Sequence, residues 1–388
     1  LALELLDDCE DRIAVYQFEA LHFLEAGEGA AFPDSPRPAF SLHVGEMIDL
    51  PDQCPSLTNF TFEKEDTPET EKPVKIALIG ECMIELQEVS PGVTSQTFGG
   101  DTLNTAIYCA RLARDLPLEI DYVTALGTDT FSERMVRFWE QEGVGSSLVV
   151  RQQGETPGLY YIELEESGER IFHYWRSTAA AKKCFEYPES SRVLEALSDY
   201  HGIYLSGISL AIFTPESRKR LISRLEEISA QGISIYFDCN FRPHLWNSTE
   251  EAIELYRQLY RLSEIVFLTT EEAEVLLDGA TGDDVHQALA DLGCRESVLK
   301  DGDKPCSIHE DGTIIEVPAE KVGRVVDTTA AGDSFSAVYL VARKFGCPAE
   351  TAARMAHKTA AYVVCHKGAV APLEKMVITG KDIAKCTG

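Results

Sequence analysis

The sequence predicts an α/β protein with a mostly parallel sheet and helices on both faces. From residue 75 onward, short apolar runs alternate with amphipathic stretches of helical spacing. The apolar runs end in glycine or a polar residue, as buried strands do, and this alternation is typical of β–α–β units. Hydrophobic residues make up 44% of the 388 residues, which is enough to build a core.

The elements follow one another in pairs. The predicted strands are "KIALIGECMIEL" (75–86), "IDYVTALG" (120–127), "GIYLSG" (202–207), "ISIYFDCN" (233–240) and "IVFLT" (265–269). The predicted helices are "DTLNTAIYCARLARDL" (101–116), "DTFSERMVRFWEQEG" (129–143), "PESRKRLISRLEEISAQG" (215–232), "STEEAIELYRQLYRLS" (248–263), "TEEAEVLLDG" (270–279) and the apolar stretch after Ala330. Each helix therefore returns the chain to the sheet for the next strand.

One insert breaks the alternation. The stretch "GLYYIELEESGERIFHYWR" (158–176) consists of two alternating strands about a Glu-Ser-Gly turn and is rich in aromatic residues. A hairpin that projects from an α/β core is a candidate lid over a site. We therefore predict a small β lid at about 158–176.

Residues 1–72 differ from the rest of the chain. They are acidic, contain "EGAAFPDSPRPAF", and end in the charged, proline-containing stretch "FEKEDTPETEKP" (62–73), which is typical of a linker. We predict an N-terminal extension over 1–72 and one large domain over 73–388. The extension carries no chemistry motif, and an accessory domain, a fusion remnant and a mobile tail all remain open.

Composition excludes several classes of function. The net charge of −29 argues against sequence-independent binding to nucleic acid or to anionic membrane. The eleven cysteines show no CxxC pairs, so we expect no zinc site or disulfide framework, and Cys82, Cys109, Cys239 and Cys365 are predicted in the core. We find no apolar run of about 18 residues and no signal peptide at the start, and we expect a cytoplasmic protein.

The tetrapeptide Ala330-Ala331-Gly332-Asp333 precedes the last apolar helix. A helix N-terminus offers free N–H donors and a partial positive charge, which favour an anion such as a phosphate. A carboxylate there can also take a proton from a substrate hydroxyl. The residues alone leave two roles open for Asp333, a catalytic base or an N-cap.

The surrounding motif "DTTAAGDSFSA" (327–337) resembles the C-terminal signature DTxGAGDxF of the ribokinase-like (PfkB) carbohydrate kinases, with Ala330 at the usual first glycine. Further segments resemble the 2-keto-3-deoxygluconate kinases of that family and follow their order. They are "IGECMIEL" (79–86), "FGGDTLNTA" (98–106), "YVTALGTD" (122–129), "PGLYYIE" (157–163), "GERIFHYWR" (168–176), "YLSGISLAI" (204–212) and "FDCNFRPHLW" (237–246). The resemblance implies a ribokinase-like three-layer αβα sandwich with a β-strand lid.

The resemblance also implies a reaction. ATP would phosphorylate the 6-hydroxyl of 2-keto-3-deoxygluconate, with Asp333 as the base that takes the hydroxyl proton. The N–H groups of Ala331, Gly332 and Asp333 would form the anion hole, and Ala330 would belong to the same phosphate-binding turn. Phosphoryl transfer needs mainly positioning and charge neutralisation, which these groups supply once ATP and Mg²⁺ are held.

The sugar site would be formed by Gly99, Gly100 and Asn104 of "FGGDTLN" and by the hairpin residues Tyr160, Tyr174 and Arg176. The residues alone also allow "FGGDTLN" to be a tight turn with Asp101 as a helix cap. An acid sugar needs a cation for its carboxylate, and the candidates are Arg176 and Arg242. Arg176 is alternatively a solvated strand-end residue, and Arg242 alternatively contacts an ATP phosphate. Only one of Tyr160 and Tyr161 should face the sugar, because neighbours on a strand alternate.

The nucleotide side would include Asn240 and Arg242 of "NFR", and Lys300 and Gly302 of "LKDGDKPC" (299–306), where Asp301 replaces the basic residue common in the family. Glu272 aligns with the glutamate of the family's NxxE motif, which is linked to magnesium, although Thr269 replaces the asparagine. Surface charge is the plain alternative for Glu272. Asp327 and Thr329 match positions where the family holds a monovalent cation such as potassium.

The sequence thus predicts an ATP- and Mg²⁺-dependent sugar-acid kinase that assembles as a homo-oligomer through its lid. Two alternatives stay open. One is another ribokinase-family sugar kinase, acting on a neutral sugar such as fructose or on 2-keto-3-deoxygalactonate. The other is a catalytically inactive scaffold with a kinase fold, which the departures at Ala330, Thr269 and Asp301 allow.

Overall fold

The computed structural model describes residues 72–90, 92–164 and 170–386. The predicted N-terminal extension up to residue 71 and the turn of the predicted hairpin at 166–168 lie outside these ranges. Apart from the strand predicted at 75–86, the predicted strands and helices are all present within them. None of the helices in the described part combines the length and the apolar character that crossing a bilayer requires.

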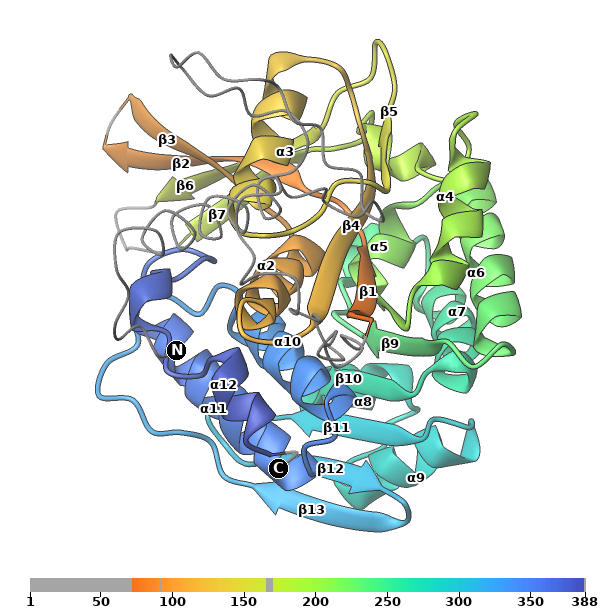
Figure 1. Ribbon diagram of the computed structural model, residues 1–388, viewed down its shortest axis with the longest axis vertical. Coiled ribbons are helices and arrows are strands. Elements are labelled where there is room, and N and C mark those ends of the chain that lie inside the picture. The colour runs from red at the N-terminus through yellow and green to blue at the C-terminus, as the bar shows by residue number, and fades with distance from the viewer. Residues whose placement is uncertain (1–71, 91, 165–169, 387–388) are drawn as a thin grey trace, which may run out of the picture. The chain divides into compact units, whose positions relative to one another are not determined.

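The described residues form a large sheet of nine strands in the order β13-β12-β11-β10-β9-β8-β1-β4-β5 (Figure 1). Its strands are β1 (Val74–Ile79), β4 (Leu118–Leu126), β5 (Val149–Arg151), β8 (Gly202–Ser206), β9 (Ser234–Asp238), β10 (Ile265–Thr269), β11 (Glu296–Lys300), β12 (Cys306–Glu310) and β13 (Thr313–Val317). Along the sheet from β11 through β10, β9, β8, β1 and β4 to β5, each strand pairs in parallel with its neighbour. The pairs β11–β12 and β12–β13 are antiparallel. The sheet is therefore mostly parallel, as predicted.

Helices cover both faces of this sheet. One group is α2 (Asp101–Ala113), α3 (Thr130–Gln141), α10 (Ala331–Lys344), α11 (Ala349–Val364) and α12 (Gly380–Ala384), and the other is α4 (Ser190–Ala196), α5 (Gly207–Ile212), α6 (Pro215–Ser229), α7 (Thr249–Leu262), α8 (Thr270–Leu276) and α9 (Asp283–Asp291). Strand β1 shows why. Ile76 and Leu78 join the core that contains α2 and α10, whereas Ala77 and Ile79 join the core that contains α6 and α7. This is the predicted three-layer αβα architecture.

A second sheet of four strands, in the order β3-β2-β6-β7, forms the lid (Figure 1, upper left). The predicted hairpin is β6 (Gly158–Leu164) with β7 (Arg170–Trp175), while β2 (Met83–Ser90) and β3 (Val93–Gly99) were not predicted as lid strands. The expectation that residues 75–86 form one strand is wrong, because the chain turns between β1 and β2 at residues 80–82. A Cβ on Gly80 would lie 1.9 Å from Thr102 Oγ1, so this turn packs closely on α2.

The three parallel strands in the middle of the large sheet end on polar residues. Asp238 ends β9, Thr269 ends β10 and Lys300 ends β11, and the three strands are neighbours. The carboxyl ends of parallel strands share one edge of a sheet, where α/β proteins place their ligand sites. Of the cysteines predicted in the core, Cys82, Cys109 and Cys239 are buried, but Cys365 is exposed because it follows the last residue of α11.

Candidate active site

A cavity of about 820 Å³ opens at this sheet edge, between the lid, the strand ends and the first turn of α10. Its size falls in the range of pockets for small molecules. Most predicted site residues line it: Gly100, Asn104, Tyr160, Tyr174, Arg176, Asn240, Arg242, Glu272, Lys300, Gly302, Thr329, Ala330, Ala331, Gly332 and Asp333. Segments from across the sequence thus converge on one cavity.

Two predicted residues are not part of the cavity lining. A Cβ on Gly99 would lie 2.5 Å from the Tyr160 hydroxyl, so Gly99 makes room for that side chain instead. Asp327 is buried, and its Oδ1 accepts hydrogen bonds from the Thr329 N–H (3.1 Å) and hydroxyl (2.7 Å). Its Oδ2 accepts from the Gly368 N–H at 2.8 Å. In the structure Asp327 therefore braces the loop that leads into α10.

Asp333 lies in the first turn of α10 and is not its N-cap, which is Ala330. Its Oδ2 accepts a hydrogen bond from Asn104 Nδ2 at 2.9 Å, across 229 residues of sequence. Burial raises the pKa of Asp333 from its ordinary 3.8 to about 8, with help from the negative charges of Asp101 and Asp238, while the Asn104 hydrogen bond and Lys300 oppose the shift. A carboxyl with this pKa is suited to proton transfer near neutral pH.

One of the three N–H groups predicted to bind an anion has a carbonyl partner within the protein. The first N–H groups of a helix have no intrahelical partner and can face an anion. Of the three predicted donors, the Ala331 N–H donates to the Thr328 carbonyl at 3.2 Å. This leaves the N–H groups of Gly332 and Asp333 as the donors for an anion.

Ala330 adopts the left-handed conformation, with φ of 61° and ψ of 12°. This region is strained for residues that carry a Cβ and is easily reached by glycine. The Ala330→Gly variant is therefore expected to raise the free energy of unfolding by about 1 kcal/mol, once the larger entropy of the unfolded glycine chain is included. Urea unfolding tests this, and a loss of stability would contradict the strain.

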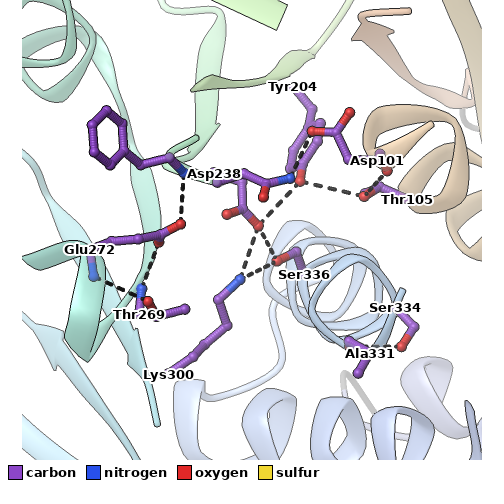
Figure 2. A network of polar contacts seen from close by, with 12 residues as sticks. Asp101, Thr105, Tyr204, Asp238, Thr269, Glu272, Lys300, Ala331, Ser334 and Ser336 are labelled. Carbon is purple, nitrogen blue, oxygen red and sulfur yellow. Dashed lines mark hydrogen bonds and ion pairs between the residues drawn. The ribbon is translucent and has the colours of Figure 1, made fainter. Parts of the chain in front are cut away.

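Asp101 and Asp238, which were not predicted as site residues, also line the cavity, and Asp238 is buried. Asp101 begins α2, where Gly100 is the N-cap, so the alternative that Asp101 caps this helix is wrong. Its Oδ2 accepts from Asn240 Nδ2 at 2.8 Å, and burial raises its pKa. Asp238 forms an ion pair with Lys300 at 3.0 Å (Figure 2). The motif "FDCNFR" contains Asp238, but only the folded chain reveals its partner.

Glu272 is tied into the turn between β10 and α8. Its carboxylate accepts from the N–H of Thr269 at 2.9 Å and from the N–H of Phe241 at 2.7 Å, and Thr269 caps the helix in return (Figure 2). Burial raises the pKa of Glu272, and the charge of Asp238 adds to the shift. The alternative of plain surface charge is wrong, because this carboxylate is largely buried and lines the cavity. Thr269, which stands where the family motif has asparagine, is thus the N-cap of α8.

At the lid end, Arg176 forms an ion pair with Glu81, a residue that was not predicted. The side chains of Arg176 and Glu81 are 14% and 2% exposed, so the alternative of a solvated strand-end arginine is wrong. Burial raises the pKa of Glu81, and Arg176 opposes this shift. The pair joins the end of β7 to the turn before β2 and thereby fixes the base of the lid.

Removing one member of a buried ion pair leaves the other charge without compensation. We expect Arg176→Ala to lower the free energy of unfolding by about 3 kcal/mol, because Glu81 then stays buried alone. The double variant Glu81→Gln with Arg176→Ala should recover part of this loss. Equal stability of the double and single variants in urea unfolding would show that the pair contributes little.

Arg242 differs from Arg176. It is exposed, has no ion pair among the described residues, and donates from Nη1 to the carbonyl of Phe241 at 3.0 Å. The Tyr174 ring packs at a tilt against the Tyr160 ring, with ring centroids 5.9 Å apart. Burial raises the pKa of Tyr174, while the charges of Arg176 and Arg242 oppose the shift. Tyr160 lines the cavity and Tyr161 does not, in agreement with the predicted alternation. Among the described residues, Arg242 thus lines the cavity without a carboxylate partner, unlike Arg176.

The described residues contain no group of three or more His, Cys, Asp or Glu side chains placed to hold a metal ion. A magnesium ion that comes with ATP needs only one or two protein carboxylates, since phosphates and waters fill its other positions. Glu272 and Glu271 offer such oxygens at the cavity wall. The site therefore fits a metal that enters with the nucleotide.

Comparison with known proteins agrees with this architecture. The family model for pfkB family carbohydrate kinases matches residues 74–376. The 2-dehydro-3-deoxygluconokinase of Escherichia coli strain K12 is 46% identical over 305 residues, which cover 78% of this chain and 98% of the relative.

Two solved structures share the fold. The 2-dehydro-3-deoxygluconokinase of Thermotoga maritima has a TM-score of 0.69 at 18% identity, covering 81% of this chain and 99% of that one. A ribokinase II from E. coli in complex with ATP and Mg²⁺ has a TM-score of 0.68 at 21% identity, covering 80% and 98%. With the family match spanning most of its length, the chain belongs to the pfkB family of carbohydrate kinases.

Proposed function

We propose that this protein transfers the γ-phosphoryl group of ATP to the 6-hydroxyl of 2-dehydro-3-deoxygluconate, also called 2-keto-3-deoxygluconate. The observation that carries the proposal is the 46% identity to a 2-dehydro-3-deoxygluconokinase over nearly that enzyme's full length. The cavity supports it, since the Asp333 carboxyl, the N-terminus of α10 and two arginines, Arg176 and Arg242, all line it.

Asp333 acts as the general base. Asn104 holds its Oδ2 in place at 2.9 Å, and the raised pKa lets the carboxylate take the proton of the 6-hydroxyl as phosphoryl transfer begins. The N–H groups of Gly332 and Asp333 and the partial charge of the α10 N-terminus stabilise the negative charge on the moving phosphoryl group. Lys300, beside this turn, adds a full positive charge.

The sugar acid binds under the lid. Its carboxylate lies against Arg242, which has no other carboxylate partner among the described residues, and against the buried Arg176. Tyr160 and Tyr174 flank the sugar on the lid side, while Gly100 and Asn104 bind from α2. Closing the lid excludes water, which would otherwise compete for the phosphoryl group.

ATP enters at the other end of the cavity. Gly302, together with His357 and Ala360 of α11, lines the cavity and would contact the nucleotide. Asn240 and Lys300 reach toward the phosphates from the strand ends. When bound, Mg²⁺ would neutralise phosphate charge, with Glu272 as the protein carboxylate that holds it. The loop at Asp327 and Thr329 would hold a monovalent cation such as potassium. The ATP and Mg²⁺ bound in the E. coli ribokinase II structure support ATP and Mg²⁺ as ligands of this fold.

We further propose that the protein assembles as a homo-oligomer through the lid. On β7, Ile171 and Trp175 alternate with the cavity residues Phe172 and Tyr174, and so point away from the site. Trp175 is 61% exposed. An exposed apolar row on a sheet is typical of a surface that another chain covers.

The reaction is tested by ADP release with ATP, Mg²⁺ and a panel of acceptors: 2-keto-3-deoxygluconate, 2-keto-3-deoxygalactonate, fructose and ribose. We expect turnover with the keto-deoxy acid and little with the neutral sugars. Preference for 2-keto-3-deoxygalactonate or fructose would move the assignment to another kinase of the family. Absence of turnover from folded protein would favour the scaffold.

A further inference from the structure

The ammonium group of Lys300 lies where a cation is not expected. It lies 3.3 Å from Ser336 Oγ, and a Cβ on Gly332 would be 3.6 Å from it. Gly332 and Ser336 are four residues apart and so share one face of α10 at its start. The N-terminus of a helix carries partial positive charge and disfavours a cation. Something else must hold Lys300 there.

Asp238 provides that counter-charge. Its Oδ2 lies 3.0 Å from Lys300 Nζ, 2.7 Å from Ser336 Oγ and 3.4 Å from the Tyr204 hydroxyl. Figure 2 shows these contacts meeting on one carboxylate oxygen at the end of β9. Asp238 is 5% exposed, so little solvent screens the pair. Strand β8, strand β9 and helix α10, which carry Tyr204, Asp238 and Ser336, thus fix the position of one ammonium group.

Other carboxylates compete for the same cation. Asp333 and Glu272 line the same cavity, and the negative charges of both raise the pKa of Lys300. If Lys300 moved onto Asp333, the ion pair would stabilise the carboxylate and weaken it as a base. The contact of Asp238 with Lys300 prevents this and leaves Asp333 bonded to Asn104.

We propose that Asp238 is a positioning residue for phosphoryl transfer, which holds the Lys300 ammonium group beside the anion-binding turn of α10 and away from Asp333. The proposal rests on the proposed kinase function. It assigns Asp238 no contact with the substrates, so its effect on the reaction passes through Lys300.

A double-mutant cycle tests this, with Asp238→Asn, Lys300→Met and the double variant. Asparagine keeps the shape of Asp238 and removes its charge. We expect Asp238→Asn to lower kcat about tenfold with a smaller change in the KM of the sugar acid, the loss typical of a charge-assisted hydrogen bond. In the Lys300→Met background the same substitution should have no further effect on kcat. An equal loss in both backgrounds would overturn the proposal and indicate direct contact of Asp238 with a metal or phosphate.

Binding of ATP, measured by calorimetry over the same cycle, separates this proposal from the proposed reaction. Lys300→Met should weaken ATP binding about tenfold, and Asp238→Asn should change ATP affinity only when Lys300 is present. If the wild-type protein bound ATP in this way but phosphorylated none of the acceptors, the positioning role would stand and the proposed reaction would fall. Unchanged ATP affinity in Lys300→Met would overturn the positioning role.

Glu296→Gln is the matched control. Glu296 is buried at the opposite end of β11 from Lys300 and pairs with Arg343 of α10 at 2.7 Å. It therefore joins β11 to α10, as the contact of Lys300 with Ser336 does, but outside the cavity. We expect Glu296→Gln to lower the unfolding temperature while kcat and ATP affinity stay as in the wild type. A similar loss of kcat in Glu296→Gln would attribute the effect of Asp238→Asn to stability and overturn the proposal.

Discussion

The Asp333→Asn variant is expected to lose about 10³-fold in kcat with 2-keto-3-deoxygluconate, the range of a missing general base. Asparagine has the same shape and can still bond to Asn104, but it cannot take a proton. ATP binding, measured by calorimetry, should remain because the N-terminus of α10 is unchanged. Retention of kcat would show that another group removes the hydroxyl proton.

The pH dependence of the wild-type enzyme follows from the same carboxyl. Because the base must be deprotonated and its pKa is about 8, kcat/KM should rise with pH up to about that value and then level off. A plateau that begins near the ordinary pKa of an aspartate would contradict the role of burial at this site.

The stability of the folded protein should fall as the pH rises, whereas its activity should increase. An acid whose pKa is higher in the folded protein binds its proton more tightly there, so this carboxyl stabilises the folded state at low pH. The contribution is lost as the pH rises from the ordinary pKa of 3.8 to about 8. The Asp333→Asn protein should therefore gain stability over the wild type between about pH 6 and about pH 9. Thermal unfolding at both pH values measures this, and an unchanged difference would indicate that the carboxyl is not desolvated.

The second large effect is expected from Arg242→Ala, which should lower kcat/KM for the sugar acid about 50-fold and leave that for fructose unchanged. The loss is that of a charge-assisted hydrogen bond to the substrate carboxylate, which a neutral sugar lacks. Arg242→Lys is the matched control, since it keeps the charge without the bidentate geometry and should recover part of the activity.

Two results would contradict this assignment. Equal losses with both sugars would mean that Arg242 does not bind the carboxylate. A rise in the KM of ATP with an unchanged KM of the sugar acid would make Arg242 a phosphate contact, the second role that the sequence leaves open for this residue.

The predictions from the sequence hold where the signal is local. Helices such as α7 and strands such as β8 follow directly from the spacing of apolar residues. The lid strands β2 and β3 were not predicted, because β1 and β2 form one apolar run in the sequence. Only the close turn at Gly80 places β1 and β2 in different sheets. Pattern alone does not show where a continuous run changes partners.

The same limit applies to the site. Asp333, Asn104 and Lys300 were predicted as site residues, because they lie in motifs that resemble those of the family. Glu81 and Asp238 were missed, since each is defined by a partner far along the chain: Arg176 lies 95 residues from Glu81, and Lys300 lies 62 residues from Asp238. Burial and ion pairing at such separations arise from the fold, and the spacing of residues in the sequence does not predict them.

The pairing of β2 with β6 has a consequence for how the chain folds. These strands pair in parallel, with Met83 opposite Gly158, and β3, α2, β4, α3 and β5 lie between them in the sequence. Closing so long a loop is entropically costly until the intervening elements are in place, so the lid should be among the last parts to form. The end of the site that holds Asp333 and Lys300 belongs to the core and would be complete earlier. A folding intermediate of this protein should therefore bind nucleotide before it can bind sugar.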